Sequence, residues 1–317
     1  MKTISRNATR CTIAALTLLL VALTLSGSRK RERVEDHPLL EAIERVFERS
    51  QTDDLKEYGL DNSLSSPGVY NHSIKGCWLK KGEGKINSPT LEPGVEYAVI
   101  AAGDKHATKV KIKILNVVGQ IRSATDSDPV LTESTEDNAT PGAVFKLTKK
   151  QSVGIRISLE DVDPDSGKDS AYVAFLLLRK DAGWDVPLAN IKQVAQRLQK
   201  RIDKVREANA GSADLAYSWF SIHGGVIPGG ASSSNGHNFK AGGKYIVVAA
   251  SDDNAETLEV SADGNVRAPK DEEILDDEPK VTYKNTPKSQ FTGQHKVKNN
   301  GKTSIVLVGI VQLIEGG

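Results

Sequence analysis

Residues 91–104 read LEPGVEYAVIAAGD, and residues 239–252 read FKAGGKYIVVAASD. In both segments an apolar residue, a glycine turn, a tyrosine and an apolar run follow one another at the same spacing. Self-similarity of this kind is the sequence signature of a duplicated unit. The correspondence of Tyr97 with Tyr245 therefore predicts two copies of one domain-sized unit in the chain.

The two halves of the chain resemble each other beyond these segments. Trp78 precedes the first tyrosine segment as Trp219 precedes the second. Each half then has a glycine-containing turn, an acidic segment with a proline, and a strongly apolar final strand. We expect the two tryptophans to occupy equivalent buried places, because large aromatic side chains at repeated positions contribute most to core packing.

Composition excludes some classes of partner. The chain has 317 residues, enough for two domains with separate cores, and its 42 Lys and Arg almost balance 41 Asp and Glu. A formal net charge of +1 offers no general attraction to nucleic acid or to an anionic membrane. Aromatic residues are 5%, which is low for a protein that grips sugars or bases by stacking. We expect a protein or cell-envelope partner.

Residues 1–28 have the features of an export signal. Basic residues precede a mostly apolar run at 11–25, and small residues suited to cleavage follow at 26–28. A basic segment at 29–33 comes next, so an uncleaved signal anchor is the alternative, and it would give the only membrane contact. In both cases the body of the protein is expected in the periplasm, the cell envelope or the extracellular space.

Cys77 is the only cysteine that follows this signal. One cysteine cannot form an internal disulfide, so the fold must depend on packing even in an oxidising compartment. We expect Cys77 to be a small buried residue beside Trp78 and not a reactive thiol.

The order of elements predicts a mainly β protein. Short apolar or alternating runs, separated by Gly, Pro, Asn and Asp, predict β-rich units at 69–184 and 213–317. Residues 29–68 form an N-terminal helix and linker in this prediction. A helix at 185–212 has apolar residues three and four apart and basic residues on its other faces. The expected fold is two tandem jelly-roll-like antiparallel β-sandwich domains joined by this amphipathic α-helix, which packs within the chain or pairs with a second copy.

The order of a tryptophan strand, a glycine turn before a tyrosine strand, an acidic stretch and a final apolar strand resembles bacterial pre-peptidase C-terminal domains. The resemblance covers residues 76–180 and 217–314. It implies a jelly-roll-like sandwich that serves as a noncatalytic accessory or adhesion module. The glycine–tyrosine pair that this family has before its last strands is replaced here by Gly154-Ile155 and Gly293-Gln294.

The acidic segment at 160–169, EDVDPDSGKD, carries the sharpest local signal. Alternating carboxylates near a glycine are able to converge on a hard cation, so Ca²⁺ ligands are predicted at Asp161, Asp163, Asp165 and Asp169. The spacing departs from an EF-hand loop, because Gly167 is at position seven when Asp161 is counted as position one, and no glutamate closes the loop. The alternative is a solvated connection between strands, and the second unit has no counterpart.

No catalytic motif has comparable strength. The histidines lack His-x-x-x-His spacing, and the nucleophile elbow Gly-x-Ser-x-Gly that would accompany an oxyanion-hole turn at 223–225 is absent. The glycine-rich residues 223–236 are instead expected to form a loop between strands.

The leading expectation is therefore an exported noncatalytic envelope or extracellular protein with duplicated β-sandwich binding or accessory modules. The alternatives are a calcium-stabilised adhesion module and a hydrolase whose site is assembled from residues far apart in the sequence.

Overall fold

The computed structural model describes the following ranges: residues 37–60, 73–117, 123–180, 189–209, 212–217, 220–239, 243–263, 280–284 and 291–313. The predicted export signal, Trp219 and the acidic segment of the second half lie outside them. Residues Pro38–Gly317 belong to one compact unit. Within the described ranges, none of the helices has the length and apolar character needed to cross a membrane.

The helices and strands follow one another in this order: α2 (Pro38–Ser50), β1 (Tyr58–Leu60), β2 (Ile74–Lys80), β3 (Gly84–Asn87), β4 (Thr90–Leu91), β5 (Glu96–Gly103), β6 (Ala107–Asn116), β7 (Val130–Glu133), β8 (Gly142–Lys146), β9 (Gln151–Val162), the 3₁₀ helix η1 (Pro164–Ser166), β10 (Ser170–Lys180), α3 (Ala189–Ala208), β11 (Ala213–Leu215), β12 (Ile222–Ile227), β13 (Ser232–Phe239), β14 (Lys244–Ser251), β15 (Leu258–Asp263), β16 (Lys280–Lys284), β17 (Phe291–Asn299) and β18 (Ser304–Leu313).

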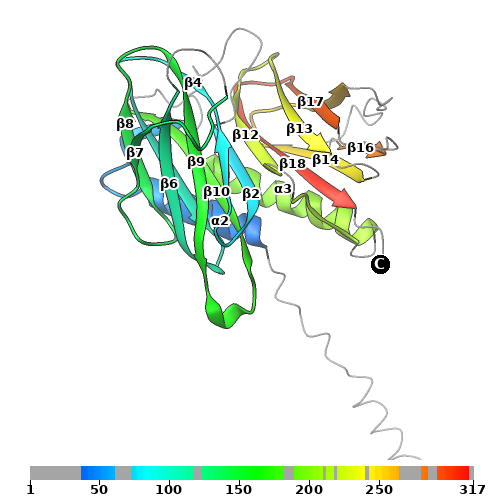
Figure 1. Cartoon of the computed structure of the whole chain (residues 1–317). Helices are drawn as coiled ribbons and strands as arrows, with labels where there is room; N and C mark the ends of the chain where they lie inside the picture. Colours follow the sequence, from blue (N-terminus) through cyan, green and yellow to red (C-terminus); the bar gives the residue numbers. More distant parts are fainter. Residues whose placement is uncertain are drawn as a thin grey trace, which may run out of the picture. The chain divides into compact units, whose positions relative to one another are not determined.

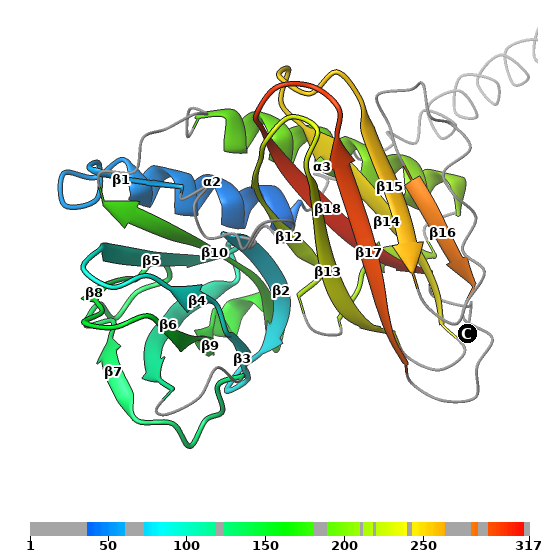
Figure 2. The same ribbon diagram turned by 90° about the horizontal axis from the view of Figure 1, so that it is seen from above.

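One antiparallel sheet of ten strands extends through both halves of the chain. Its strand order is β16-β14-β18-β12-β2-β10-β5-β8, with β1 added on β10 and β11 on β18. A five-stranded sheet, β3-β9-β6-β7 with β4 on β9, faces the first half of this main sheet, and the three-stranded sheet β13-β17-β15 faces the second half. The helices α2 and α3 contact each other and cover the opposite face of the main sheet (Figures 1 and 2).

Three buried clusters fill these layers. The first sandwich core lies between the main and the five-stranded sheet and includes Tyr97, Ile112 and Phe175. The second sandwich core includes Tyr245 and Val308. A helix-side core is common to both halves, since residues from α2, α3 and strands of each half belong to it. The mainly β, sandwich-like architecture expected from the sequence is confirmed.

Both helices follow from their apolar spacing. Pro38 begins α2, where its missing N–H costs nothing, and Leu39, Ala42, Ile43 and Val46 form its buried face. In α3 the buried residues recur three and four apart: Ile191, Val194, Ala195, Leu198, Ile202 and Val205. Each helix buries this face against the main sheet, so α3 packs within the chain.

The same order of elements occurs twice in the chain: a helix, a short strand and then a sandwich. We call residues 38–180 the first repeat and residues 189–313 the second repeat. Tyr97 in β5 lies opposite Arg179 of β10, and Tyr245 in β14 lies opposite Gln312 of the corresponding strand β18. Both tyrosines are fully buried. The expected equivalence of Tyr97 and Tyr245 is confirmed.

The tryptophans do not correspond. Trp78 lies opposite Tyr172 of β10, and by the same register the residue opposite Ile305 of β18 is Val226. Val226 therefore holds the place that was predicted for Trp219, which lies outside the described residues. The prediction that paired the two tryptophans is wrong, because the spacing from tryptophan to tyrosine differs between the two halves.

The two repeats meet at β2 and β12. Ile74, Lys75 and Gly76 pair with Gly224, His223 and Ile222 in an antiparallel register, which makes the main sheet continuous. The expected two-domain arrangement is thus not confirmed: α3 does not stand between two separate sandwiches, because its apolar face lies in the core shared by both repeats. The boundaries 29–68, 69–184, 185–212 and 213–317 stay predictions.

Glycine at this meeting point permits close approach of strands. A Cβ atom on Gly224 would lie 2.2 Å from the carbonyl oxygen of Val306. The glycine-rich residues expected to form a loop at 223–236 are accordingly mostly strand, in β12 and β13. That prediction is wrong for residues 223–227 and 232–236, which are strand, and it holds for residues 228–231, which form the turn between β12 and β13.

Candidate functional site

The predicted calcium ligands are not gathered into one site. Asp161 lies in β9, with its Oδ1 2.7 Å from Nζ of Lys81, and the hydrogen bond from this lysine lowers the pKa of Asp161. Asp163 caps η1 by accepting a hydrogen bond from the backbone N–H of Asp165 at 3.0 Å. Asp169 accepts a hydrogen bond from the backbone N–H of Lys81 through its carbonyl oxygen.

In the described part of the chain, no group of three or more His, Cys, Asp or Glu side chains is arranged to hold a metal ion. The acidic segment connects β9 to β10 through the 3₁₀ helix η1, whose N-cap is Asp163. Calcium binding by Asp161, Asp163, Asp165 and Asp169 stays a prediction from sequence.

A buried aspartate ends the tyrosine strand of each repeat. Asp104 accepts hydrogen bonds from the backbone N–H groups of His106 and Tyr172, both at 2.9 Å, and burial raises its pKa. Asp252 occupies the corresponding place and accepts from the backbone N–H of Asn254 at 3.2 Å and from Nδ2 of Asn190 at 2.8 Å. Both carboxylates hold the end of a strand, so their role is structural.

An arginine from each helix fixes the helix against this strand end. Nη1 of Arg45 in α2 donates to the carbonyl oxygen of Gly103 at 3.1 Å, and Nη1 of Arg197 in α3 donates to that of Ser251 at 2.8 Å. The two helices therefore have a common register against the sheet. In this register Lys200 stands where the first repeat has Glu48.

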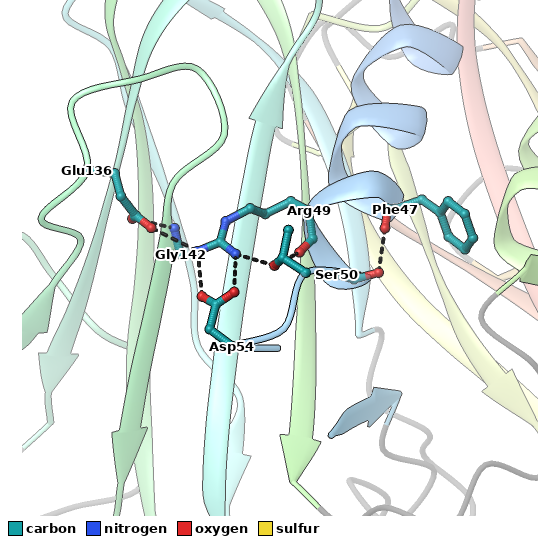
Figure 3. A network of polar contacts seen from close by, with 7 residues as sticks. Phe47, Arg49, Ser50, Asp54, Glu136 and Gly142 are labelled. Atoms are coloured by element: carbon teal, nitrogen blue, oxygen red, sulfur yellow. Dashed lines mark hydrogen bonds and ion pairs between the residues drawn. The ribbon is translucent and has the colours of Figure 1, made fainter. Parts of the chain in front are cut away.

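The same register places Arg201 at the position of Arg49, which belongs to a network of ion pairs in the first repeat (Figure 3). Its Nη1 and Nη2 atoms each lie 2.9 Å from an oxygen of Asp54, and Nη2 lies 2.9 Å from Oε1 of Glu136. Oε2 of Glu136 accepts from the backbone N–H of Gly142 at 2.8 Å. The hydrogen bonds with Arg49 lower the pKa of Asp54 to about 2.

The corresponding corner of the second repeat contains a cleft of about 370 Å³. One wall is α3, and the other is the loop of residues 252–257 between β14 and β15. The equivalent loop of the first repeat, residues 104–106, is shorter. The lining residues are Arg197, Lys200, Arg201, Ser251, Asp252, Asp253, Ala255, Glu256, Thr257 and Leu258.

The charged side chains of this cleft differ in their contacts and in their exposure to solvent. Nη2 of Arg197 forms an ion pair with Asp253, whose pKa is lowered by that hydrogen bond. Asp252 is buried and bonded as described above. Lys200 and Glu256 are exposed to solvent. Among the described residues that line the cleft there is no histidine or cysteine. The arrangement presents charged and polar side chains that are suited to recognising a polar or charged group.

Sequence reasoning missed this cleft, because none of its lining residues forms a motif. The signal that was available is the comparison of repeats: Glu48 in one helix is replaced by Lys200 in the other. A second missed signal is Ser73-Ile74-Lys75-Gly76, which matches Ser221-Ile222-His223-Gly224 in three of four residues and marks the strands that join the repeats.

Burial shifts the pKa values of two side chains in β2, the strand of the first repeat that pairs with the second repeat. Cys77 is buried, as expected, and burial raises the pKa of its thiol to about 12. Lys75 is 7% exposed, its Nζ lies 5.1 Å from the ring centroid of Phe220, and burial lowers its pKa to about 8. A thiol with so high a pKa is not a nucleophile near neutral pH.

No protein-family model matches the chain, and no curated protein sequence matches it. Three solved structures similar to it are a conserved protein of unknown function from Pseudomonas aeruginosa PAO1, the M60 catalytic domain with the CBM51-1 and CBM51-2 domains from Clostridium perfringens ZmpB, and the N-terminal CBM22-1-CBM22-2 tandem domain from Paenibacillus barcinonensis Xyn10C.

Their sequence identities to this chain are 8%, 9% and 8% in that order. The alignments cover 79%, 77% and 80% of this chain, and 84%, 34% and 96% of the three structures. The TM-scores are 0.17, 0.23 and 0.20. At TM-scores this low, the likeness carries no argument about fold or function.

Proposed function

We propose that this protein is an exported, noncatalytic binding protein of the cell envelope or the extracellular space, and that the cleft of the second repeat is its binding site. The cleft provides charged and polar side chains on two walls, and its described lining has neither histidine nor cysteine. A protein or cell-envelope component is the partner expected from the sequence.

The observation that carries this proposal is the difference between two corners of a duplicated fold. In the first repeat the helix arginine is bound by Asp54 and Glu136 of the same chain. In the second repeat the corresponding Arg201 lines a cleft whose volume falls within the range of small-ligand sites, roughly 300–1,000 Å³. A cleft of this size beside a helix of the second repeat supports a binding role for that repeat.

The scaffold around the cleft supports the same role. The walls of the cleft are attached to the main sheet through Asp252 and through the hydrogen bond from Arg197 to Ser251. A site held by secondary structure loses little conformational entropy when a ligand binds. The shared helix-side core further ties the second repeat to the first.

Binding is tested by melting the full chain in the presence of a panel of short oligosaccharides and peptides. We expect at least one compound to raise the midpoint of the unmodified protein but not that of Glu256→Trp, in which a large side chain fills the cleft. Lys105→Trp, a matched change in the equivalent loop of the first repeat, should respond like the unmodified protein. A panel without any effect, or an effect that persists in Glu256→Trp, would contradict the cleft as the site.

Export is tested separately by fusing residues 1–37 to a reporter enzyme that is active only outside the cytoplasm. Reporter activity supports the proposed location, and an inactive fusion of normal abundance contradicts it. Chemical conversion of any compound that binds would contradict the noncatalytic part of the proposal and favour the hydrolase alternative.

A further inference from the structure

We propose that the exposed face of Tyr217 is a second binding site, at which a pyranose sugar ring stacks on an aromatic platform made by Tyr217 and Trp78. Neither of these residues lines the cleft described above. The platform therefore goes beyond the proposed function, and its test has an outcome that is independent of the cleft.

Tyr217 follows β11 and has one covered and one open ring face. Its ring lies on the indole of Trp78, with the ring centroids 5.3 Å apart and the planes 12° from parallel. The side chain of Tyr217 is nevertheless 49% exposed, and among the described residues it is the aromatic member of the four exposed large hydrophobic side chains. Because a stacked ring has one face covered by its partner, exposure of about half the side chain leaves the opposite face toward solvent.

The residues behind the platform hold it in place. Trp78 is 9% exposed, and its ring packs edge-on against Tyr172 with the centroids 5.4 Å apart. Tyr172 is fully buried, and its hydroxyl oxygen lies 3.2 Å from Oγ of Ser221. Nζ of Lys85 donates to the carbonyl oxygens of Trp78 and Tyr217, at 3.0 and 3.2 Å. These contacts fix the ring before a ligand arrives, so little conformational entropy is lost on binding.

Polar groups lie near the hydroxyl edge of the Tyr217 ring. The hydroxyl forms a hydrogen bond with the side chain of Ser170. Burial raises the pKa of Tyr217, and the negative charges of Asp214 and Asp169 raise it further. Asp214 is held in an ion pair with Arg206, whereas Asp169 is exposed to solvent. The open aromatic face therefore has hydroxyl and carboxylate oxygens nearby, and both kinds of oxygen accept hydrogen bonds from sugar hydroxyl groups.

This combination matches the surface of a pyranose ring. A pyranose has a face of C–H groups, which packs on an aromatic ring, and hydroxyl groups at its edge, which need hydrogen-bond partners. A purely apolar ligand would cover the same face but leave the neighbouring oxygens without new partners. The low aromatic content of the chain argues against a long row of stacking residues, whereas a single ring is enough for one sugar unit.

Isothermal titration of the full chain tests the proposal with four probes: cellotriose, tri-N-acetylchitotriose, sorbitol and tetraproline. We expect at least one trisaccharide to bind and sorbitol not to bind, because sorbitol is an open chain that has hydroxyl groups but no ring face. Tyr217→Ala should weaken the binding by about tenfold, whereas Tyr217→Phe, which keeps the ring, should retain most of the affinity. The control Leu131→Ala removes an exposed apolar side chain from β7 and should leave the affinity unchanged.

Three results would overturn the platform as a sugar site: no binding of either trisaccharide, the same affinity in Tyr217→Ala as in the unmodified protein, or binding of tetraproline alone. The last result would assign the ring to a proline-rich peptide. If Tyr217→Ala lowers the melting midpoint, Tyr217→Leu still covers Trp78 without an aromatic face. Weakened binding in that variant supports stacking, and unchanged affinity contradicts it.

Glu256→Trp distinguishes this site from the cleft. Sugar binding that persists in Glu256→Trp and is weakened in Tyr217→Ala supports the platform, whether or not the cleft binds a ligand. Sugar binding that Glu256→Trp abolishes and Tyr217→Ala leaves intact belongs to the cleft and contradicts the platform.

Discussion

The same helix position has different surroundings in the two repeats. In the first repeat, Arg49 is bound by Asp54 and Glu136, and the corner is filled by the protein's own carboxylates. In the second repeat, Arg201 lines a cleft between α3 and the loop of residues 252–257. An arginine in the same register thus belongs to an ion-pair network in one copy and lines a cleft in the other. Equivalent positions in the two repeats thus have different surroundings, because the chain segments next to the helix differ.

The largest expected effect is that of a substitution in β12, the strand of the second repeat that pairs with the first repeat. A Cβ on Gly224 would lie 2.2 Å from the carbonyl oxygen of Val306, so Gly224→Val should lower the free energy of unfolding by about 3 kcal/mol. Urea unfolding measures this. Gly94→Ala serves as the control: a Cβ there meets no atom within 4 Å, and only its φ of 77° is unfavourable. Equal losses in the two variants would show that β12 is not tightly held.

Lys75 and His223 occupy equivalent positions at that joint, and the lysine is destabilising at neutral pH. Because burial lowers the pKa of Lys75 to about 8 from an ordinary value of 10.5, the unfolded chain binds its proton more tightly. The penalty is complete below pH 8 and disappears as the pH rises toward 10.5. Lys75→Met should therefore raise the free energy of unfolding at pH 7 by about 3 kcal/mol at most.

Unfolding of Lys75→Met at pH 7 and at pH 10.5 checks this prediction. The gain should be present at the first pH and largely absent at the second. Lys80→Met, an exposed change in the same strand, is the control and should have little effect at either pH. A gain that is the same at both pH values would assign the effect to packing and not to charge.

Arg49→Gln tests how much the ion pairs of Arg49 contribute to stability in the first repeat. Removing the guanidinium leaves Asp54 and Glu136 without their cation, and we expect a loss of about 1 kcal/mol, since Asp54 is 59% exposed and its ion pair is screened by solvent. Arg49 keeps the pKa of Asp54 near 2. The contribution is therefore present above about pH 4 and is lost as the pH falls toward 2.

Melting of Arg49→Gln and of the unmodified protein at pH 7 and at pH 3 checks this prediction. The deficit of Arg49→Gln should be smaller at the lower pH, because Asp54 begins to bind its proton there. A deficit that is the same at both pH values would contradict a contribution from this ion pair.

The smallest expected effect concerns the acidic segment of the first repeat, which the second repeat lacks. Asp161 is paired with Lys81 and Asp163 caps η1, so we expect the melting midpoints in millimolar Ca²⁺ and in chelator to agree. A higher midpoint in Ca²⁺ that Asp163→Ala abolishes would instead support the calcium site predicted from the sequence.

Local sequence patterns were sufficient to predict helices and strands but not to predict which strands pair with one another. The apolar run after Tyr97 and the other short apolar or alternating runs predicted strands that the structure contains. The joint between β2 and β12 was not predicted, because a period of two tells which face a residue occupies and not which strand pairs with it. The cleft was missed for a related reason, since its walls come from a helix and a loop that no motif connects.

By itself, the sequence determined the duplication, the strand-rich content, the two amphipathic helices and the burial of Tyr97, Tyr245 and Cys77. Each of these depends on spacing or residue type within a short segment. Only the tertiary structure decided that the two repeats share one sheet, that α3 covers it, and that Arg49 is enclosed while Arg201 lines a cleft. These features depend on contacts between residues far apart in the chain, whose free energies are set by the fold and not by the local pattern.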